Sequence, residues 1–288
     1  TTIDIAQAGN FHRQLTDVGA DFFAWGDGGR SITWALGSTF YRRPLAGGPT
    51  HAFRSEVELP RAVVHGNLLL RGATLITERG DEVIPDADLL IVNDRIAALG
   101  PRGSVRIPQH TKIWPVPGKW IVPGFIDTHD HIADIRRGIL DFDSWGPLAN
   151  LAYGVTTAFD PSPLSIDMLA YQDAVDAGLM PGSRIAQTGT AIFSFNEFKS
   201  YAQVRAVLSR YRDDYRVGNL KMYRSGNRRV RQWIVMAARE LGLQPTTEGA
   251  LSMKLDMTDI IDGYAGNEHA LTAVPLYADM VNLVAKSG

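Results

Sequence analysis

The rhythm of apolar and polar positions changes twice along the chain. In the first fifty residues, short aromatic-rich runs at 23–25, 31–34 and 39–41 are separated by glycine-containing turns. Apolar runs of this length between tight turns predict antiparallel hairpin strands. Two or three such strands do not form a stable core alone, so we expect this segment to pack against further structure.

From about residue 68 the apolar runs become longer and follow one another closely. Strands are predicted at residues 68–77, 88–92, 95–100, 112–116 and 120–122. Strands of this kind joined by tight turns favour a compact antiparallel β-sandwich. The pattern therefore predicts a small β-sandwich domain over residues 56–122, after a first β segment over residues 1–55.

Beyond Gly124 the pattern becomes strand followed by helix, repeated, which is typical of parallel βα units. A closed (β/α)₈ barrel takes about 250 residues, and only 164 remain here, so about six of eight units fit. We predict an α/β fold with a partial TIM-like barrel over residues 123–288. The expected strands are 121–127, 155–159, 183–187, 219–223, 243–247 and a sixth ending at 268–269, and the clearest helices are 230–241 and 276–286.

Composition narrows the possible functions. The chain has 29 basic and 31 acidic residues, a net charge of −2, which gives no electrostatic basis for binding nucleic acid or an anionic membrane. No apolar run reaches the roughly 18 residues of a membrane span. Cysteine is absent, so a bound metal would need histidine, carboxylate or modified lysine as ligands.

The strongest chemical signal is the string Pro-Gly-Phe-Ile-Asp-Thr-His-Asp-His at residues 123–131. Side chains two positions apart on a strand face the same side, so His129 and His131 are expected to project together. Two imidazoles placed in this way can reach one ion at about 2.0–2.1 Å. Active sites of βα barrels lie at the carboxyl ends of the strands, where this pair is predicted.

With these residues the chain resembles the amidohydrolase superfamily of metal-dependent hydrolases. The resemblance is strongest to imidazolonepropionase- and prolidase-like members that follow a TolB-like β-propeller, and the first fifty residues resemble one propeller blade. It runs from about residue 10 to residue 288. The further stretches that carry it are 70–73, 93–100, 118–124, 153–157, 220–223, 238–242, 248–249 and 262–269.

The resemblance implies a site around one or two zinc ions, or other divalent transition metals. His129 and His131 match the paired histidines after the first barrel strand, and His269 matches the histidine after the sixth. Lys221 ends the fourth strand, where many members carry a lysine that reacts with CO₂ to form a metal-bridging carbamate. Tyr223 faces the same side as Lys221 and is either a substrate contact or a packed core tyrosine.

Two features depart from the family pattern. After the fifth strand the superfamily usually has a histidine, whereas this chain has Glu248, which could replace it as a ligand or leave the metal uncontacted. The family also places an aspartate after strand eight, as metal ligand and general base. This chain stops at Gly288, so we expect it to be a fragment in which no residue takes that role.

The implied activity is hydrolysis of an amide, cyclic amide or dipeptide C–N bond by metal-activated water, with Lys221 and Glu248 as catalytic residues. One alternative is a catalytically incompetent fragment that acts as a folded or oligomerising domain. Another is a lactonase- or phosphotriesterase-like hydrolase. The expected partners are a small-molecule substrate and, through open sheet edges, further copies of the chain. The family suggests a periplasmic or secreted protein, but this sequence does not fix the compartment.

Overall fold

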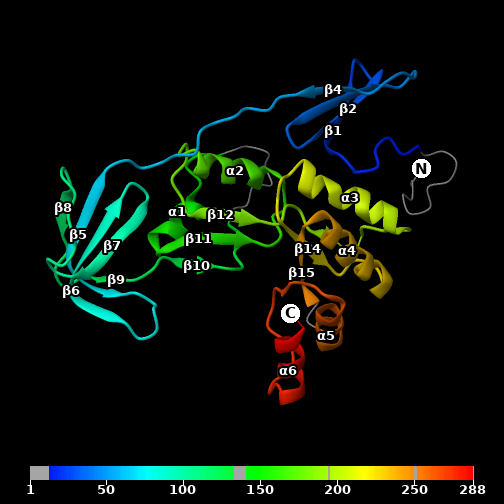
Figure 1. Ribbon diagram of the computed structural model, residues 1–288. Helices are drawn as coiled ribbons and strands as arrows, with labels where there is room; N and C mark the ends of the chain where they lie inside the picture. The colour runs from blue at the N-terminus through cyan, green and yellow to red at the C-terminus, as the bar shows by residue number, and fades with distance from the viewer. Residues whose placement is uncertain (1–12, 133–140, 194, 250–251, 288) are drawn as a thin grey trace.

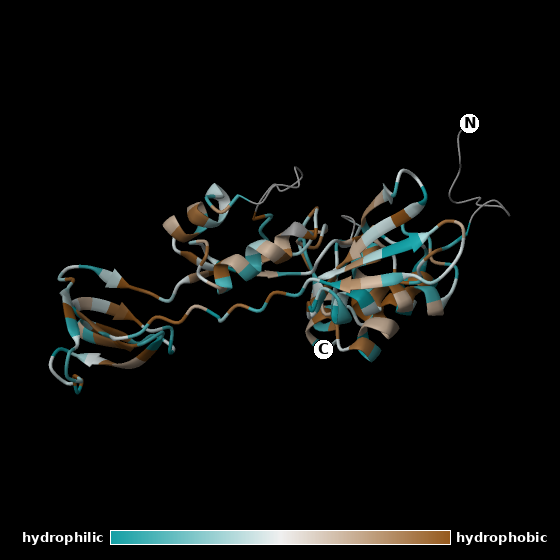
Figure 2. Cartoon of the chain, turned by 90° about the horizontal axis from the view of Figure 1, so that it is seen from above, coloured by the Kyte–Doolittle hydropathy of each residue, from teal (hydrophilic) through white to brown (hydrophobic). Residues whose placement is uncertain are grey.

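The computed structural model describes residues 13–132, 141–193, 195–249 and 252–287. They form a four-stranded sheet, a five-stranded sheet, and a series of strands and helices that contains two parallel sheets (Figure 1). The five-stranded sheet lies at one end of the molecule and is joined to the rest by two extended segments (Figure 2). No helix in these described ranges has both the length and the apolar character needed to cross a membrane.

The first sheet is a simple antiparallel meander in the order β1-β2-β3-β4. Its first three strands confirm the predicted hairpins. The fourth was missed, because all four of its residues are exposed and give no alternating pattern. The assignment of this whole sheet as a propeller blade stays a prediction. The strands are β1 (Asp21–Gly26), β2 (Ser31–Leu36), β3 (Thr39–Pro44) and β4 (His51–Arg54).

The second sheet corrects the expectation of purely antiparallel strands. Its order is β7-β6-β5-β8, with β9 also paired to β5, and both β8 and β9 run parallel to β5. The chain leaves β7 and crosses through residues 102–111, so that it enters β8 in the direction of β5. The strands are β5 (Asn67–Ile76), β6 (Val83–Val92), β7 (Arg95–Pro101), β8 (Lys112–Pro115) and β9 (Trp120–Ile121).

The remaining residues alternate between strand and helix, as predicted, except that β13 follows β12 with no helix between them. The strands form two separate parallel sheets, β10-β11-β12 and β13-β14-β15-β16. Their membership of a partial barrel stays a prediction. The elements are β10 (Phe125–Asp127), α1 (Trp145–Ala152), β11 (Val155–Asp160), α2 (Asp167–Asp176), β12 (Arg184–Gln187), β13 (Ile192–Phe193), α3 (Tyr201–Asp213), β14 (Asn219–Tyr223), α4 (Arg228–Leu241), β15 (Gln244–Thr247), α5 (Met253–Asp262), β16 (Gly266–Asn267) and α6 (Ala278–Lys286).

The strand expected at 88–92 begins earlier, at Val83, and two strands of the βα series also differ from their predicted bounds. The strand expected at 121–127 is divided, because Ile121 pairs with β5 whereas Phe125 pairs with β11. Pro123 lies between these two pairings and has no N–H to donate to a ladder. The sixth strand, expected to end at 268–269, ends at Asn267, so the residues that follow it lie in a loop.

The largest core lies where α3 and α4 pack on β14 and β15, and it sets the direction of the side chains on β14. Leu220 and Met222 are buried in this core together with Ile234 of α4. Because alternate residues on a strand point to opposite faces, Lys221 and Tyr223 project away from the helices. The packing of α3 and α4 therefore turns these two side chains toward the opposite face of the sheet.

Candidate active site

His129 and His131 lie just beyond the strand on which they were expected. β10 ends at Asp127, whose Oδ1 accepts a hydrogen bond from the His129 backbone N–H at 3.0 Å. The two imidazole rings have centroids 5.4 Å apart and are nearly perpendicular. Strand alternation is therefore not what brings them together; a turn braced by Asp127 places them side by side.

A carboxylate holds each ring of the histidine pair through its Nδ1 atom. His129 Nδ1 lies 3.0 Å from Glu268 Oε2, and His131 Nδ1 lies 3.2 Å from Asp160 Oδ1. Asp160 is almost completely buried, and burial raises its pKa although hydrogen bonds from Ser162 and His131 act in the opposite direction. With both Nδ1 atoms engaged, the Nε2 atoms are the ones left for other contacts.

Neither of these carboxylates was predicted from the sequence. Asp160 closes β11 and Glu268 follows β16, so each lies at the carboxyl end of a parallel strand. That position was the available signal, because the carboxyl ends of neighbouring parallel strands meet at one edge of the sheets. Glu268 is also fixed by a hydrogen bond from the Thr246 hydroxyl, which holds it in place toward His129.

Lys221, Glu248 and His269 form a second group beside the histidine pair. Lys221 is 1% exposed, and its Nζ lies 2.6 Å from Glu248 Oε2. The other oxygen of Glu248 lies 2.6 Å from His269 Nε2. The ring of His269 is 5.0 Å from that of His129, centroid to centroid, so the two groups are neighbours.

One cavity of about 560 Å³ contains all five residues for which the sequence indicated a metal-binding role. Tyr223 also lines it, and its ring lies 5.4 Å from that of Phe193. Leu164 and Pro163 add to the apolar part of the wall. The cavity therefore combines a polar end, with imidazoles, a lysine and carboxylates, and an apolar end of the kind that small-molecule sites use.

The donor chemistry of the polar end fits a divalent transition metal. Among the described residues, no three His, Asp or Glu side chains stand as they are in an arrangement that could hold an ion. Glu248 is engaged by Lys221 and His269, and it would have to turn from them to ligate. Imidazole nitrogens and carboxylate oxygens are zinc-class ligands, and a carboxylate on Nδ1 is the usual support of a metal-binding histidine.

Comparison with models of known protein families gives no match. Curated proteins match over part of the chain. It is 31% identical over 100 residues to adenine deaminase 3 of Rhizobium meliloti, which is 34% of this chain and 16% of that enzyme. It is 36% identical over 120 residues to an adenine deaminase of Chelativorans sp., 42% of this chain and 18% of that enzyme. The chain thus matches less than a fifth of the length of these relatives.

Solved structures match a larger share of the chain at lower identity. A Xaa-Pro dipeptidase with bound methionine has a TM-score of 0.60 at 15% identity. The match covers 77% of this chain and 65% of the dipeptidase chain. Molinate hydrolase has a TM-score of 0.60 at 18% identity, with coverages of 78% and 62%. At such low identity, the structural similarity shows a common fold alone. Together with the deaminase matches, it supports the resemblance of this chain to hydrolytic enzymes of the amidohydrolase superfamily.

Proposed function

We propose that this chain provides the metal-binding part of a hydrolase that cleaves a C–N bond in a small molecule. The observation that carries the proposal is the meeting of His129, His131, Lys221, Glu248 and His269 in one cavity. These residues come from four different strand ends, and a structural role alone does not require imidazoles and a buried lysine to converge. The relatives named adenine deaminase and the neighbour named Xaa-Pro dipeptidase favour nitrogen as the leaving atom.

The proposed ligands are the Nε2 atoms of His129 and His131, with Lys221, Glu248 and His269 completing the set around one or two zinc ions. Glu268 and Asp160 hold the two rings from behind at 3.0 and 3.2 Å. Such support fixes the ring orientation and raises the basicity of the ligating nitrogen. A zinc ion bound here would polarise the scissile carbonyl and lower the pKa of its water.

Lys221 is proposed to react with CO₂ and become a carbamate. In that reaction the neutral amine attacks CO₂, an N–C bond forms, and one proton leaves the nitrogen. Glu248 Oε2 lies 2.6 Å from Nζ and is placed to accept that proton. The carbamate then offers anionic oxygen ligands, which suit hard divalent ions better than an ammonium group does.

The other residues of the cavity position the substrate. Tyr223 and Phe193 form an aromatic part of the wall, and Leu164 belongs to the same lining. These apolar side chains exclude water from the place where the scissile bond would lie, and that exclusion strengthens electrostatic interactions in the site. Within the described residues no side chain is assigned the role of general base.

The test is the metal content of the purified protein. We expect bound zinc in the unaltered chain, measured by mass spectrometry of the elements, and a loss of most of it in the His129→Ala/His131→Ala double variant. The control is His51→Ala/His65→Ala, which removes two exposed histidines outside the cavity and should leave the zinc content unchanged. Equal zinc in the two double variants would rule out the proposed site.

A further inference from the structure

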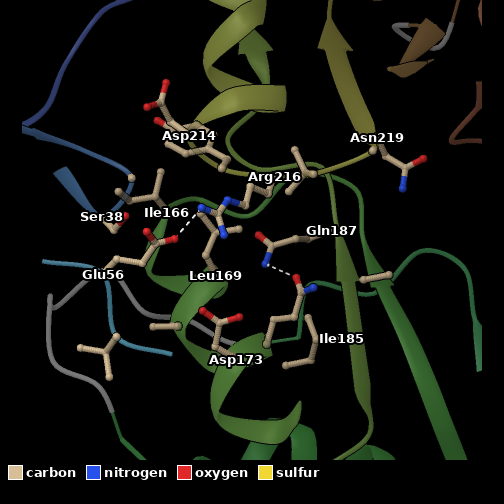
Figure 3. Close-up of a pocket in the computed structure, with 18 of the residues that line it drawn as sticks. Ser38, Glu56, Ile166, Leu169, Asp173, Ile185, Gln187, Asp214, Arg216 and Asn219 are labelled. Atoms are coloured by element: carbon tan, nitrogen blue, oxygen red, sulfur yellow. Dashed lines mark hydrogen bonds and ion pairs between the residues drawn. The ribbon is translucent and has the colours of Figure 1, made fainter. Parts of the chain in front are cut away.

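A second cavity, of about 630 Å³, lies apart from the histidine pair. Its walls are α2, β12 and the segment 214–219 that leads into β14 (Figure 3). The turn between β2 and β3 and the residues after β4 close the remaining side, so the first sheet also contributes to the lining. None of its lining residues is shared with the proposed metal site.

The cavity carries an excess of negative charge. It is lined by the carboxylates of Glu56, Asp173 and Asp214 and by one cation, Arg216. Arg216 is already paired with Glu56 at 2.5 Å, and Figure 3 shows this pair on one side of the cavity. In the described part of the chain, neither Asp173 nor Asp214 has an ion pair or a side-chain hydrogen bond. Neither of these two carboxylates has a direct ion pair, although Arg216 acts on Asp173 and Arg210 acts on Asp214 from a distance.

Burial and repulsion both act on these two carboxylates. Burial raises the pKa of Asp173, and the neighbouring carboxylate of Asp176 raises it further, against a smaller effect of Arg216. Burial likewise raises the pKa of Asp214, with additional repulsion from Asp213 and Asp21, against a smaller effect of Arg210. A cation beside either carboxylate would relieve the repulsion that acts on it.

An independent feature points to a ligand that donates hydrogen bonds. The side chain of Gln187 is only 3% exposed, and its Nε2 donates to Gln172 Oε1 at 3.0 Å. Its Oε1 has no partner among the described residues, and in Figure 3 the oxygen points into the cavity while the nitrogen faces Gln172. A buried acceptor without a donor is unfavourable, so a ligand N–H at this place would be stabilising.

The rest of the lining is apolar and comes mainly from Ile166, Leu169 and Ile185. We propose that this cavity binds a small organic cation, an ammonium group carried on an apolar alkyl or aryl stem. The ammonium would donate to Gln187 Oε1 and pair with Asp173, and the stem would lie against the three aliphatic side chains. The volume is within the range of small-molecule sites, and charge-assisted hydrogen bonds are the stronger class.

The test uses benzylammonium chloride as the probe, with benzyl alcohol as the uncharged molecule of the same shape. We expect calorimetric titration of the whole chain to show binding of benzylammonium and at least about tenfold weaker binding of benzyl alcohol. Asp173→Asn and Gln187→Leu should each weaken benzylammonium binding about tenfold. Circular dichroism confirms that each variant is folded, and Asp173→Asn alone decides the result if Gln187→Leu is not.

The matched control is Asp176→Asn, which removes a nearby carboxylate of the same helix that pairs with Arg61 and does not line the cavity. It should bind the probe as the unaltered chain does, and so should the His129→Ala/His131→Ala variant, because the inference does not depend on the metal site. Equal binding of benzyl alcohol and benzylammonium would overturn the proposal. So would equal weakening by Asp176→Asn and Asp173→Asn, or no binding at millimolar probe.

Discussion

Lys221 is the residue whose environment most needs an explanation. Its side chain is 1% exposed, and the described residues provide one ion-pair partner, Glu248. An ammonium group is costly to bury and is almost never fully buried without a partner. Leu220 and Met222 on either side of it face the core under the helices, whereas Lys221 faces the cavity, so core packing does not require a lysine at this position. The proposed carbamate gives the buried lysine a chemical role.

The carbamate can be detected directly. With ¹³C-labelled bicarbonate and zinc, we expect a carbamate resonance in the ¹³C spectrum of the unaltered chain. Lys221→Met, which keeps the length and apolar stem of the side chain, should abolish it. Lys112→Met, which alters an exposed lysine on β8, should leave it unchanged. A resonance that survives in Lys221→Met would place the carbamate elsewhere and remove Lys221 from the proposed ligands.

At the scale of elements, β5 and β6 are joined by a buried ion pair as well as by their ladder. Arg71 donates from Nε and Nη2 to the two oxygens of Asp88 at 2.9 and 3.0 Å, and the Asp88 side chain is fully buried. The hydrogen bonds from Arg71 lower the pKa of Asp88 most, and burial opposes them. The ionised carboxylate is therefore the form that the folded sheet favours.

This pair predicts a pH-dependent stability. Because the folded pKa is lowered, the stabilisation is present above the unfolded pKa of about 3.9 and is lost as the pH falls through the folded value. We expect Asp88→Asn to lower the unfolding midpoint by about 5 °C at pH 7. The difference from the unaltered chain should shrink below about pH 4.

The control lies two residues away on the same strand. Asp86 forms an exposed ion pair with Arg102, so Asp86→Asn should change the midpoint little at any pH. Thermal unfolding followed by circular dichroism at pH 7 and at acidic pH separates the two variants. A pH-independent effect of Asp88→Asn would show that packing, and not the charge, accounts for its contribution.

The elements that the sequence predicted well are those with a long, regular pattern. The strand 219–223 was placed at its observed bounds, and the helix expected over 230–241 starts only two residues earlier, where Asn227 caps it by accepting from the Val230 N–H. Gly242 ends that helix with φ of +70°, a conformation that glycine adopts without strain. The two-residue strand β13 carries no periodicity and was missed.

The candidate site was predictable only in part, because a local sequence pattern locates some of its residues but not the contacts between distant ones. The histidines, the lysine and Glu248 stand at strand ends that could be located, so their convergence could be expected. The carboxylates behind the rings also stand at strand ends, but their pairing with particular rings could not be expected, because Glu268 lies 139 residues from His129 in the chain and no local pattern links them. Asp160 and His131, 29 residues apart, meet through the pairing of β10 and β11, which sets the geometry only once the chain is folded.

At the scale of the whole molecule, the hydrophobic cores divide the chain unequally. Leu36 of the first sheet belongs to the same core as α3, α4 and β14, and Tyr215 donates a hydrogen bond to Asp21 at 2.6 Å. The five-stranded sheet instead has two small cores of its own, one centred on Ala73 and Leu75 and the other on Leu69. Its two extended connections keep it apart from the other elements (Figure 2).

This division predicts that the five-stranded sheet loses structure independently of the rest. Leu69 and Leu220 are both fully buried, and Leu→Ala at either site should cost about 3 kcal/mol of the unfolding free energy of its own unit. In hydrogen exchange followed by mass spectrometry, Leu69→Ala should accelerate exchange in β5–β7 and leave β14 and α4 protected. Leu220→Ala should do the reverse.

The pair of variants discriminates because each serves as the control for the other. If the two units shared one cooperative transition, both substitutions would lower protection across the whole chain by the same free energy. If they unfold separately, zinc binding should also follow the division, since all the proposed ligands lie outside the five-stranded sheet. The Leu69→Ala variant should then retain its zinc at temperatures at which the amides of its five-stranded sheet already exchange freely. Loss of the metal together with the structure of that sheet would show that the two units are coupled.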